Sequence, residues 1–229
     1  MRVVRTRRGA RIVHGKSILS EILARPGPTH SIFDLLGAIA AMRGPSARVA
    51  VLGFAAGGMI APLRALGSDA AVRAVDLDLT MVPLFEELCG EWAGDLKITR
   101  ADAVAWLGRQ RRLFDVIIED LSVPMEQDVG KPEVSFTALP AVIHEHLAPS
   151  GIAVVNVLPM ARWPWPEVRQ TLVRPWQGAG MRISFEDYVN RFVVVGRDLG
   201  TPTELSRELR ASLRAIGSEI AERFSVQRI

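Results

Sequence analysis

Short apolar runs alternate with amphipathic stretches through the middle of the chain. The runs are rich in Val, Ile and Leu and occupy residues 48–53, 71–76, 96–101, 114–120 and 151–158. Short runs dominated by apolar residues are typical of parallel strands that are covered on both faces. A helix-like segment or a loop follows each run, and this alternation builds a doubly wound sheet. The pattern therefore predicts an α/β fold.

The end of the pattern differs from its middle. Residues 182–188 and 191–197 form two strand-like runs that are separated only by Val189 and Asn190. Such a short link requires an antiparallel hairpin. Five parallel strands followed by an antiparallel pair are similar in outline to the Rossmann-like, seven-stranded sheet of the class I methyltransferases, a likeness at the level of the fold.

Both flanks of this core carry further elements. Residues 10–23 are predicted to form a small β-hairpin or loose strands, and residues 31–42 a helix. After the core, Thr201-Pro202-Thr203-Glu204 has the spacing of a capping box with Pro at the first helical position. One apolar stripe then runs through Leu205, Leu209, Leu213, Ile216, Ile220 and Phe224.

We predict three parts from this organisation. A short N-terminal β/helix appendage covers residues 1–45, and the Rossmann-like domain covers residues 46–200. An amphipathic helix covers residues 201–229 and packs on the domain through its apolar stripe.

Composition excludes a disordered chain. Hydrophobic residues make up 48% and charged residues 23% of the sequence, which is the balance of a protein that can bury a core. The 28 basic and 25 acidic residues give a net charge of only +3. Five arginines lie close to the N-terminus, but so small a surplus does not favour a nucleic-acid partner.

The sequence also limits the compartment and the metal chemistry. Cys89 is the only cysteine, so an intramolecular disulfide is impossible and a reducing cytoplasm is expected. The longest uncharged apolar stretch, residues 49–63, is shorter than the roughly 20 residues that span a bilayer, so no membrane segment is predicted. His144 and His146 face different sides of a predicted helix, and no metal site is predicted.

The first strand leads into a turn of small residues. Gly53, Gly57 and Gly58 would let the backbone approach a ligand and present amide groups to it. Ala55 stands where the G-x-G-x-x-G pattern has its middle glycine, so the motif is incomplete. The alternative is a tight strand-to-helix turn without a ligand.

Acidic residues follow the second and third strands. Asp76 ends the second strand, where a carboxylate can accept both hydroxyls of an adenosine ribose. Asp102 follows the third strand and is expected to face the adenine. Its alternative role, which is compatible with the first, is to cap the helix that begins at Ala103.

The fourth strand ends in two acids, Glu119 and Asp120. This end of the strand lies at the edge where open α/β sheets bind ligands. Desolvation there raises the pKa of a carboxylate and suits it to act as a general base. We predict that Asp120 is the acidic residue that takes part in catalysis, and that the side chain of Glu119 points to the opposite face of the sheet. The alternative for Asp120 is a capping or loop-closing role.

Residues 49–158 resemble the catalytic domain of the spermidine synthases, aminopropyltransferases that use decarboxylated S-adenosylmethionine. In that family the four strands lead to G-G-G-D-G-G, to the ribose acid, to G-D-A or G-D-G, and to F-D-V-I-I-x-D-x-x-D-P. The matching positions here are residues 53–58, Asp76, Asp102 and residues 114–124. The resemblance further implies substrate contacts for His30, which stands at the His of Y-H-E, and for Asn156, which stands at a Gln.

Two departures from the family pattern bear on the acceptor. Ala56 and Val123 stand where the family has acids that hold cationic amines. An ammonium group buried without a carboxylate partner is costly. Four other acids lie near in sequence and are candidates to substitute: Glu119, Glu126, Asp128 and Glu133. The N-terminal β-region is shorter than in the family, so we expect a homodimer or a monomer rather than a tetramer.

The functional interpretation is a transferase that binds S-adenosylmethionine or a close relative and needs no metal. Because the two amine-holding acids are missing, the sequence favours methyl transfer to an unknown small-molecule acceptor. The alternative is aminopropyl transfer from decarboxylated S-adenosylmethionine to a polyamine. A further alternative is a nucleoside-binding protein without catalytic activity.

Overall fold

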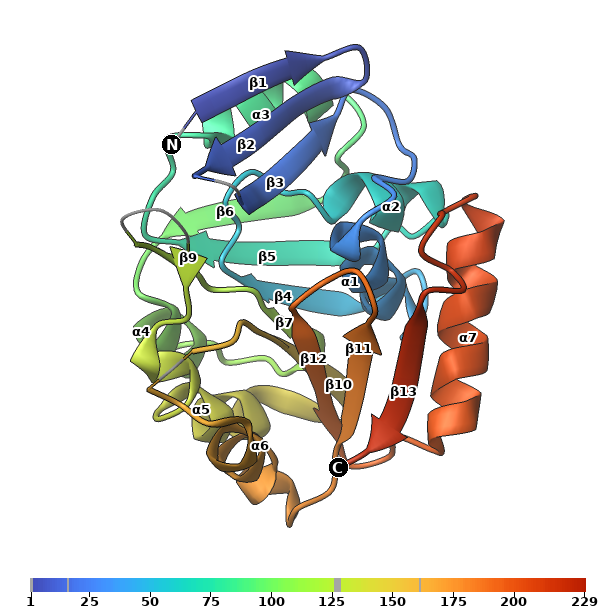
Figure 1. Ribbon diagram of the computed structural model, residues 1–229. Coiled ribbons are helices and arrows are strands. Elements are labelled where there is room, and N and C mark those ends of the chain that lie inside the picture. The colour runs from blue at the N-terminus through green and yellow to red at the C-terminus, as the bar shows by residue number, and fades with distance from the viewer. Residues whose placement is uncertain (1, 16, 126–128, 161) are drawn as a thin grey trace.

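An eight-stranded sheet forms the centre of the protein, and a three-stranded sheet lies above it in Figure 1. The computed structural model describes residues 2–15, 17–125, 129–160 and 162–229. Five neighbouring strands of the large sheet are parallel: β4 (Arg48–Leu52), β5 (Ala71–Asp76), β6 (Leu96–Arg100), β7 (Phe114–Glu119) and β10 (Leu147–Val157). They lie in the order β10-β7-β4-β5-β6. The predicted α/β fold with a parallel core is therefore confirmed.

The remaining strands of the large sheet are antiparallel. The predicted hairpin is confirmed as β11 (Met181–Phe185) and β12 (Arg191–Gly196), with β12 beside β10. The hairpin link is longer than the two residues expected, because β11 ends at Phe185. Tyr188 in the link packs edge-on against Phe185, with ring centroids 5.5 Å apart.

An eighth strand, β13 (Phe224–Arg228), pairs with β11 at the edge of the sheet. The expectation of one helix from residue 201 through the whole apolar stripe is wrong here. The capping box at Thr201 is present and begins α7 (Pro202–Ala215). Gly217 then adopts a φ of +70°, and the amides of Gly217 and Ser218 bond back to Arg214 and Leu213, which ends the helix.

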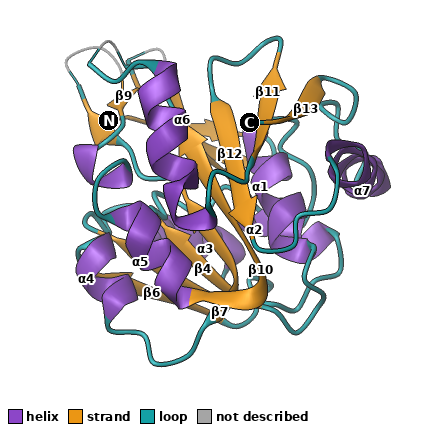
Figure 2. Ribbon diagram, turned by 90° about the horizontal axis from the view of Figure 1, so that it is seen from below, coloured by secondary structure: helices purple, strands orange, loops and turns teal. Residues whose placement is uncertain are grey.

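Helices cover both faces of the large sheet (Figure 2). One face is covered by α1 (Ile32–Ala41), α2 (Ile60–Ala65), α3 (Val82–Cys89) and α7. The other face is covered by α4 (Ala103–Gly108), α5 (Leu139–His146) and α6 (Trp165–Val173). Side chains of β4 alternate between the two cores, with Val49 and Val51 on the first face and Ala50 and Leu52 on the second.

The N-terminal segment forms an antiparallel sheet of β1 (Arg2–Thr6), β2 (Gly9–His14) and β3 (Ser17–Leu23). The predicted hairpin is β2 with β3, and β1 is a third strand that the sequence pattern did not indicate. The predicted helix over residues 31–42 is confirmed as α1. Ser20 of β3 accepts a hydrogen bond from the amide of Gly58 at 3.0 Å, so the small sheet is attached to the loop after β4.

Short elements complete the fold. The strands β8 (Val123–Pro124) and β9 (Val129–Gly130) form a two-stranded ribbon, and the 3₁₀ helices η1 (Glu133–Ser135) and η2 (Arg174–Trp176) flank α5 and α6 in sequence. Within the described ranges, no helix has the length and apolar character needed to cross a bilayer.

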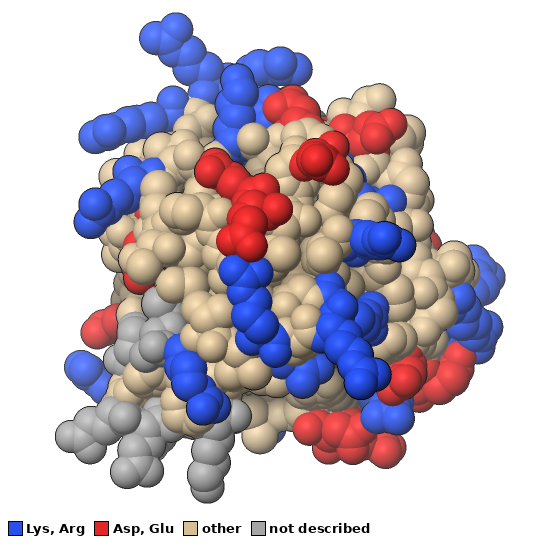
Figure 3. Space-filling model, turned by 90° about the horizontal axis from the view of Figure 1, so that it is seen from above, with Lys and Arg blue, Asp and Glu red and all other residues tan. Residues whose placement is uncertain are grey.

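Acidic and basic side chains are mixed on the face above the small sheet (Figure 3). Arg5 pairs with Glu87 at 3.0 Å, and Arg11 pairs with Glu21 at 3.1 Å. Two of the N-terminal arginines are therefore partnered by acids of the same chain.

Candidate active site

The candidate site lies where the ends of β4 and β7 meet. The strand order reverses at this point, because β5 and β7 flank β4 on opposite sides. Gly53 has a φ of +90°, and a Cβ atom there would lie 2.6 Å from the carbonyl oxygen of Asp120. Only glycine permits this approach of the two loops. The amide of Asp120 in turn donates to the carbonyl of Leu52 at 2.8 Å.

Two adjoining cavities open at this edge of the sheet. The larger has a volume of about 550 Å³ and the smaller about 230 Å³. Six residues line both cavities: Leu19, Ala55, Asp120, Leu121, Ser122 and Val129. Together the cavities are within the size range of sites that bind small molecules. Asp120 is the only acid in the described part of the chain that lines both cavities.

Asp76 lies in the wall of the smaller cavity, as predicted, together with Gly53. One carboxylate oxygen of Asp76 accepts hydrogen bonds from the amides of Phe54 and Ala55, each at 2.8 Å. The other oxygen accepts from the amide of Asp78 at 3.0 Å. Asp76 therefore orders the loop after β4 as well as facing the cavity.

Asp78 adds a second carboxylate to the smaller cavity. Its carboxylate accepts hydrogen bonds from the amide and the hydroxyl of Thr80, and these bonds lower the pKa of Asp78. The remaining lining residues include His14 and Met81. This cavity therefore combines two carboxylates with apolar surface.

Gly57 and Gly58 do not line either cavity. They face a narrow crevice beside them, where a Cβ at Gly57 would lie 2.5 Å from the ring of Phe54. A Cβ at Gly58 would lie 2.9 Å from the ring of Phe33, and its amide is already bonded to Ser20. Packing against protein side chains explains both glycines, and the predicted backbone cradle is reduced to Gly53.

Asp102 is the N-cap of α4. Its carboxylate accepts a hydrogen bond from the amide of Ala105 at 2.9 Å, and the residue is exposed. The capping role, which the sequence left open, is therefore the one that the structure shows. Asp102 is not among the described residues that line the two cavities.

A chain of three polar side chains crosses the wall of the larger cavity. The side-chain amide of Asn156, at the end of β10, donates to Asp120 Oδ1 at 2.7 Å. Asn190, from the β11–β12 link, donates to Asn156 Oδ1 at 2.9 Å. The predicted residues Asn156 and Asp120 are thus in contact, and all three residues line the cavity.

Asp120 has an unusual electrostatic environment. Burial raises the pKa of its carboxyl group to about 6, while Lys131 and the hydrogen bond from Asn156 act in the opposite direction. Glu119 and Asp76 add smaller contributions that also raise this pKa. Asp120 as a whole residue is half-buried and lines both cavities. A carboxylate with this pKa is ionised near neutral pH and can still accept a proton effectively.

Glu119 is not available to a ligand. Its side chain is fully buried and lies 2.6 Å from the ammonium group of Lys131, which is also fully buried. Ser135 donates to Glu119 at 2.9 Å, and Lys131 also donates to the carbonyl of Leu121 at 2.9 Å. The idea that Glu119 substitutes for a missing amine-holding acid is therefore wrong, and Lys131 is a buried cation that the sequence analysis missed.

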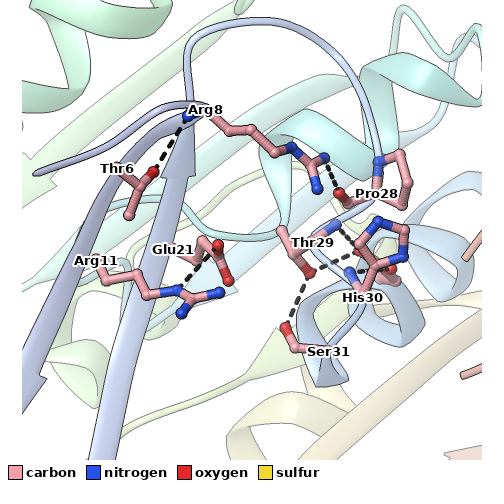
Figure 4. Close-up of polar contacts among 9 residues, drawn as sticks. Thr6, Arg8, Arg11, Glu21, Pro28, Thr29, His30 and Ser31 are labelled. Atoms are coloured by element: carbon pink, nitrogen blue, oxygen red, sulfur yellow. Dashed lines mark hydrogen bonds and ion pairs between the residues drawn. The ribbon is translucent and has the colours of Figure 1, made fainter. Parts of the chain in front are cut away.

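His30 lies away from the cavities. Its Nδ1 accepts a hydrogen bond from the amide of Glu219 at 3.4 Å, near the turn after α7. Its backbone amide donates to Asp34 at 2.9 Å, and Figure 4 shows its ring beside Thr29. The following residue, Ser31, does line the larger cavity. His30, for which the resemblance implied a substrate contact, is not among the described residues that line the two cavities.

The two positions that lack the expected acids differ in their exposure to solvent. Ala56 is fully buried, whereas Val123 is 40% exposed. Glu133 is exposed and lies 4.0 Å from Arg162, and the candidates Glu126 and Asp128 lie outside the described residues.

A different acid, Glu21 of β3, lines the larger cavity. Its side chain is 8% exposed, and one of its oxygens accepts from Arg11 (Figure 4). The sequence pattern did not indicate Glu21, because its position facing the cavity depends on how the small sheet packs. In the described part of the chain, no group of three His, Cys, Asp or Glu residues is placed to hold a metal ion.

Comparisons with known proteins agree with this architecture. No protein-family model matches the chain. A probable polyamine aminopropyl transferase of Bifidobacterium longum (strain NCC 2705) is 29% identical over 132 residues, which are 57% of this chain. The chain spans only 28% of that relative's length.

Two solved structures share the fold. A probable spermidine synthase from Corynebacterium glutamicum ATCC 13032 has a TM-score of 0.71 at 16% identity, over 99% of this chain and 85% of that one. Human methyltransferase-like protein 13, in complex with SAH, has a TM-score of 0.60 at 16% identity, over 80% and 90% of the two chains. The resemblance seen in the sequence is confirmed as a likeness: part of the chain is similar to a probable polyamine aminopropyl transferase, and the chain has the Rossmann-like fold of the class I methyltransferases, which it shares with a probable spermidine synthase.

Proposed function

We propose that this protein is a transferase that binds an adenosyl sulfonium donor in the smaller cavity and an amine acceptor in the larger one. The observation that carries the proposal is the position of Asp120 in the wall shared by the two cavities. A group at that place can act on the acceptor while both molecules are bound. Asp76 would accept hydrogen bonds from the ribose hydroxyls of the donor.

Asp120 would serve as the general base. A protonated amine has no free electron pair, so it must lose a proton before it attacks carbon. Asp120 would take that proton first, and the free amine would then attack, so that the carbon–nitrogen bond forms as the carbon–sulfur bond breaks. The bonding electrons move to sulfur, which leaves as a neutral thioether. Holding both reactants in line supplies much of the acceleration.

Aminopropyl transfer is the form of the reaction that we favour. The matched region of the Bifidobacterium longum protein supports it, and the fold shared with the probable spermidine synthase from Corynebacterium glutamicum, over 99% of this chain and 85% of that one, is consistent with it. The preference for methyl transfer rested on the missing acids at Ala56 and Val123. Glu21 and Asp120 provide carboxylates in the larger cavity, which weakens that argument.

The test is a product assay with two donors. The protein is incubated with decarboxylated S-adenosylmethionine and a panel of diamines and polyamines, and release of methylthioadenosine is measured. A parallel series uses S-adenosylmethionine and measures S-adenosylhomocysteine. We expect methylthioadenosine that appears only with an amine present, and not with Asp120→Asn. Formation of S-adenosylhomocysteine alone would establish methyl transfer instead, and nucleoside binding without either product would favour the binding protein.

A further inference from the structure

Two consecutive hydrogen bonds, from Asn190 to Asn156 and from Asn156 to Asp120, connect the β11–β12 link to the acid at the centre of the site. Asn156 is 6% exposed and sits between the other two side chains. The side-chain amide of Asn156 has one oxygen and one nitrogen, and each contacts a different neighbour. Its oxygen accepts from Asn190, and its nitrogen donates to Asp120.

The orientation of the Asn156 amide matters for the acid. With the nitrogen toward Asp120, the contact is a hydrogen bond to an ionised carboxylate. With the amide turned over, two oxygens would meet unless Asp120 were protonated. A partner that donates to the Asn156 oxygen therefore favours the orientation that suits the ionised acid.

We propose that Asn190 is a positioning residue that fixes the Asn156 amide with its N–H toward Asp120. The role assigned to Asp120 rests on the proposed function, but the hydrogen-bonded line does not. The charged groups that surround Asp120 come from other elements: Lys131 after β9, Glu119 at the end of β7 and Asp76 at the end of β5. Asn190 is uncharged, so it influences the ionisation of Asp120 through the orientation of the Asn156 amide and not through a charge of its own.

Asn190 differs from its neighbours in the β11–β12 link. The link after β11 brings Tyr188, Val189 and Asn190 to the larger cavity. Of these three residues, only Asn190 makes a described hydrogen bond into the site. Val189 is exposed and lines the same cavity without such a bond, which makes it a matched control.

The experiment is a carboxyl NMR titration of the full chain labelled with ¹³C in its aspartate side chains. The Asp120 signal is identified as the one lost in Asp120→Asn. We expect Asn190→Leu to raise the titration midpoint of Asp120 by about half a unit to one unit, since the loss corresponds to part of one hydrogen bond. Asn156→Leu should raise it by at least as much, and Val189→Ala should leave it unchanged.

Several results would overturn the proposal. An unchanged midpoint in Asn190→Leu, while Asn156→Leu shifts it, would reduce Asn190 to a structural role. An equal shift in Val189→Ala would assign the effect to general loosening of the link. If Asn190→Leu does not fold, Asn190→Ser carries the same test and should give a smaller rise. The titration needs no substrate, so absence of turnover would reject the proposed function while leaving this test intact.

Discussion

The carboxylate of Asp120 faces two cavities from a largely desolvated position, and this position has a cost in folding. Its pKa is raised to about 6 in the folded protein, above the ordinary value of 3.8. The protonated form is therefore favoured by the fold. The stability from this group is complete below about pH 4 and is lost as the pH rises through about 6.

Asp120→Asn should therefore stabilise the protein at pH 8. Asparagine keeps the shape and can still accept from Asn156, but it carries no buried charge. We expect the free energy of unfolding to rise by roughly 1–3 kcal/mol at pH 8 and to change little near pH 4. Urea unfolding at the two pH values measures this difference. A loss of stability at pH 8 would instead identify Asp120 as a loop-closing acid.

Lys131 shows the opposite case, a charge that the fold needs. Lys131→Met leaves Glu119 buried without its cation, so we expect the free energy of unfolding to fall by about 3–5 kcal/mol. The double variant Lys131→Met/Glu119→Gln should recover much of this loss, because no unpaired charge remains. Urea unfolding of the three proteins decides the point. A double variant no more stable than Lys131→Met would mean that packing, not charge, is responsible.

The sequence predicts the position of residues that end a strand or directly follow one. Gly53, Asp76 and Asp120 each follow or close a strand, so their place at the ligand edge was predictable. Lys131 and Asn190 reach the site through tertiary contacts of a loop and a hairpin link, which leave no periodic signal. The sequence also could not show that the spaces at Gly57 and Gly58 are filled by aromatic rings.

Among the elements, one buried acid joins the start of α1 to the turn after α7. Asp34 at the start of α1 is fully buried and accepts hydrogen bonds from both the amide and hydroxyl of Thr29, each at 2.7 Å. It also accepts from the amide of His30 at 2.9 Å and from the hydroxyl of Ser218 at 2.5 Å. Asp34 therefore fixes the turn after α7 against the start of α1.

Asp34→Ala should break this junction. Several buried donors would lose an ionised acceptor, so we expect the free energy of unfolding to fall by about 2–4 kcal/mol. Asp198→Ala is the control, because Asp198 is exposed and has no hydrogen bond among the described contacts. Thermal and urea unfolding of both variants provide the comparison. Equal stability of the two variants would show that the junction contributes nothing.

The same region shows where periodicity fails as a guide. The apolar stripe after Thr201 keeps a helical spacing as far as Phe224, yet the helix ends at Ala215. Gly217 breaks the helix, and the apolar side chains of Ile220 and Phe224 reach the same core from a turn and from β13. A continued helix and a turn followed by a strand can both bury apolar side chains on one side, so the apolar pattern alone could not distinguish the two structures.

At the scale of the whole molecule, the site is built by both sheets. The small sheet contributes Leu19 and Glu21, and the start of α1 contributes Ser31 and Ile32 to the larger cavity. The large sheet contributes Asp120, directly after β7, and Asn156 of β10. The N-terminal segment was predicted as an appendage to the fold, but its contribution to the cavity walls depends on packing that the sequence does not reveal.

The role of Asp120 as the base is decided by one variant, Asp120→Asn, with turnover and methylthioadenosine affinity determined on the same preparation. If Asp120 is the base between a nucleoside site and an acceptor site, turnover should fall by about two to four orders of magnitude. Nucleoside affinity, measured by calorimetry, should stay within about threefold of the parent, because the ribose contact is assigned to Asp76. Unchanged turnover would show that Asp120 is not the base, as would a loss of nucleoside affinity that by itself explains the lost activity.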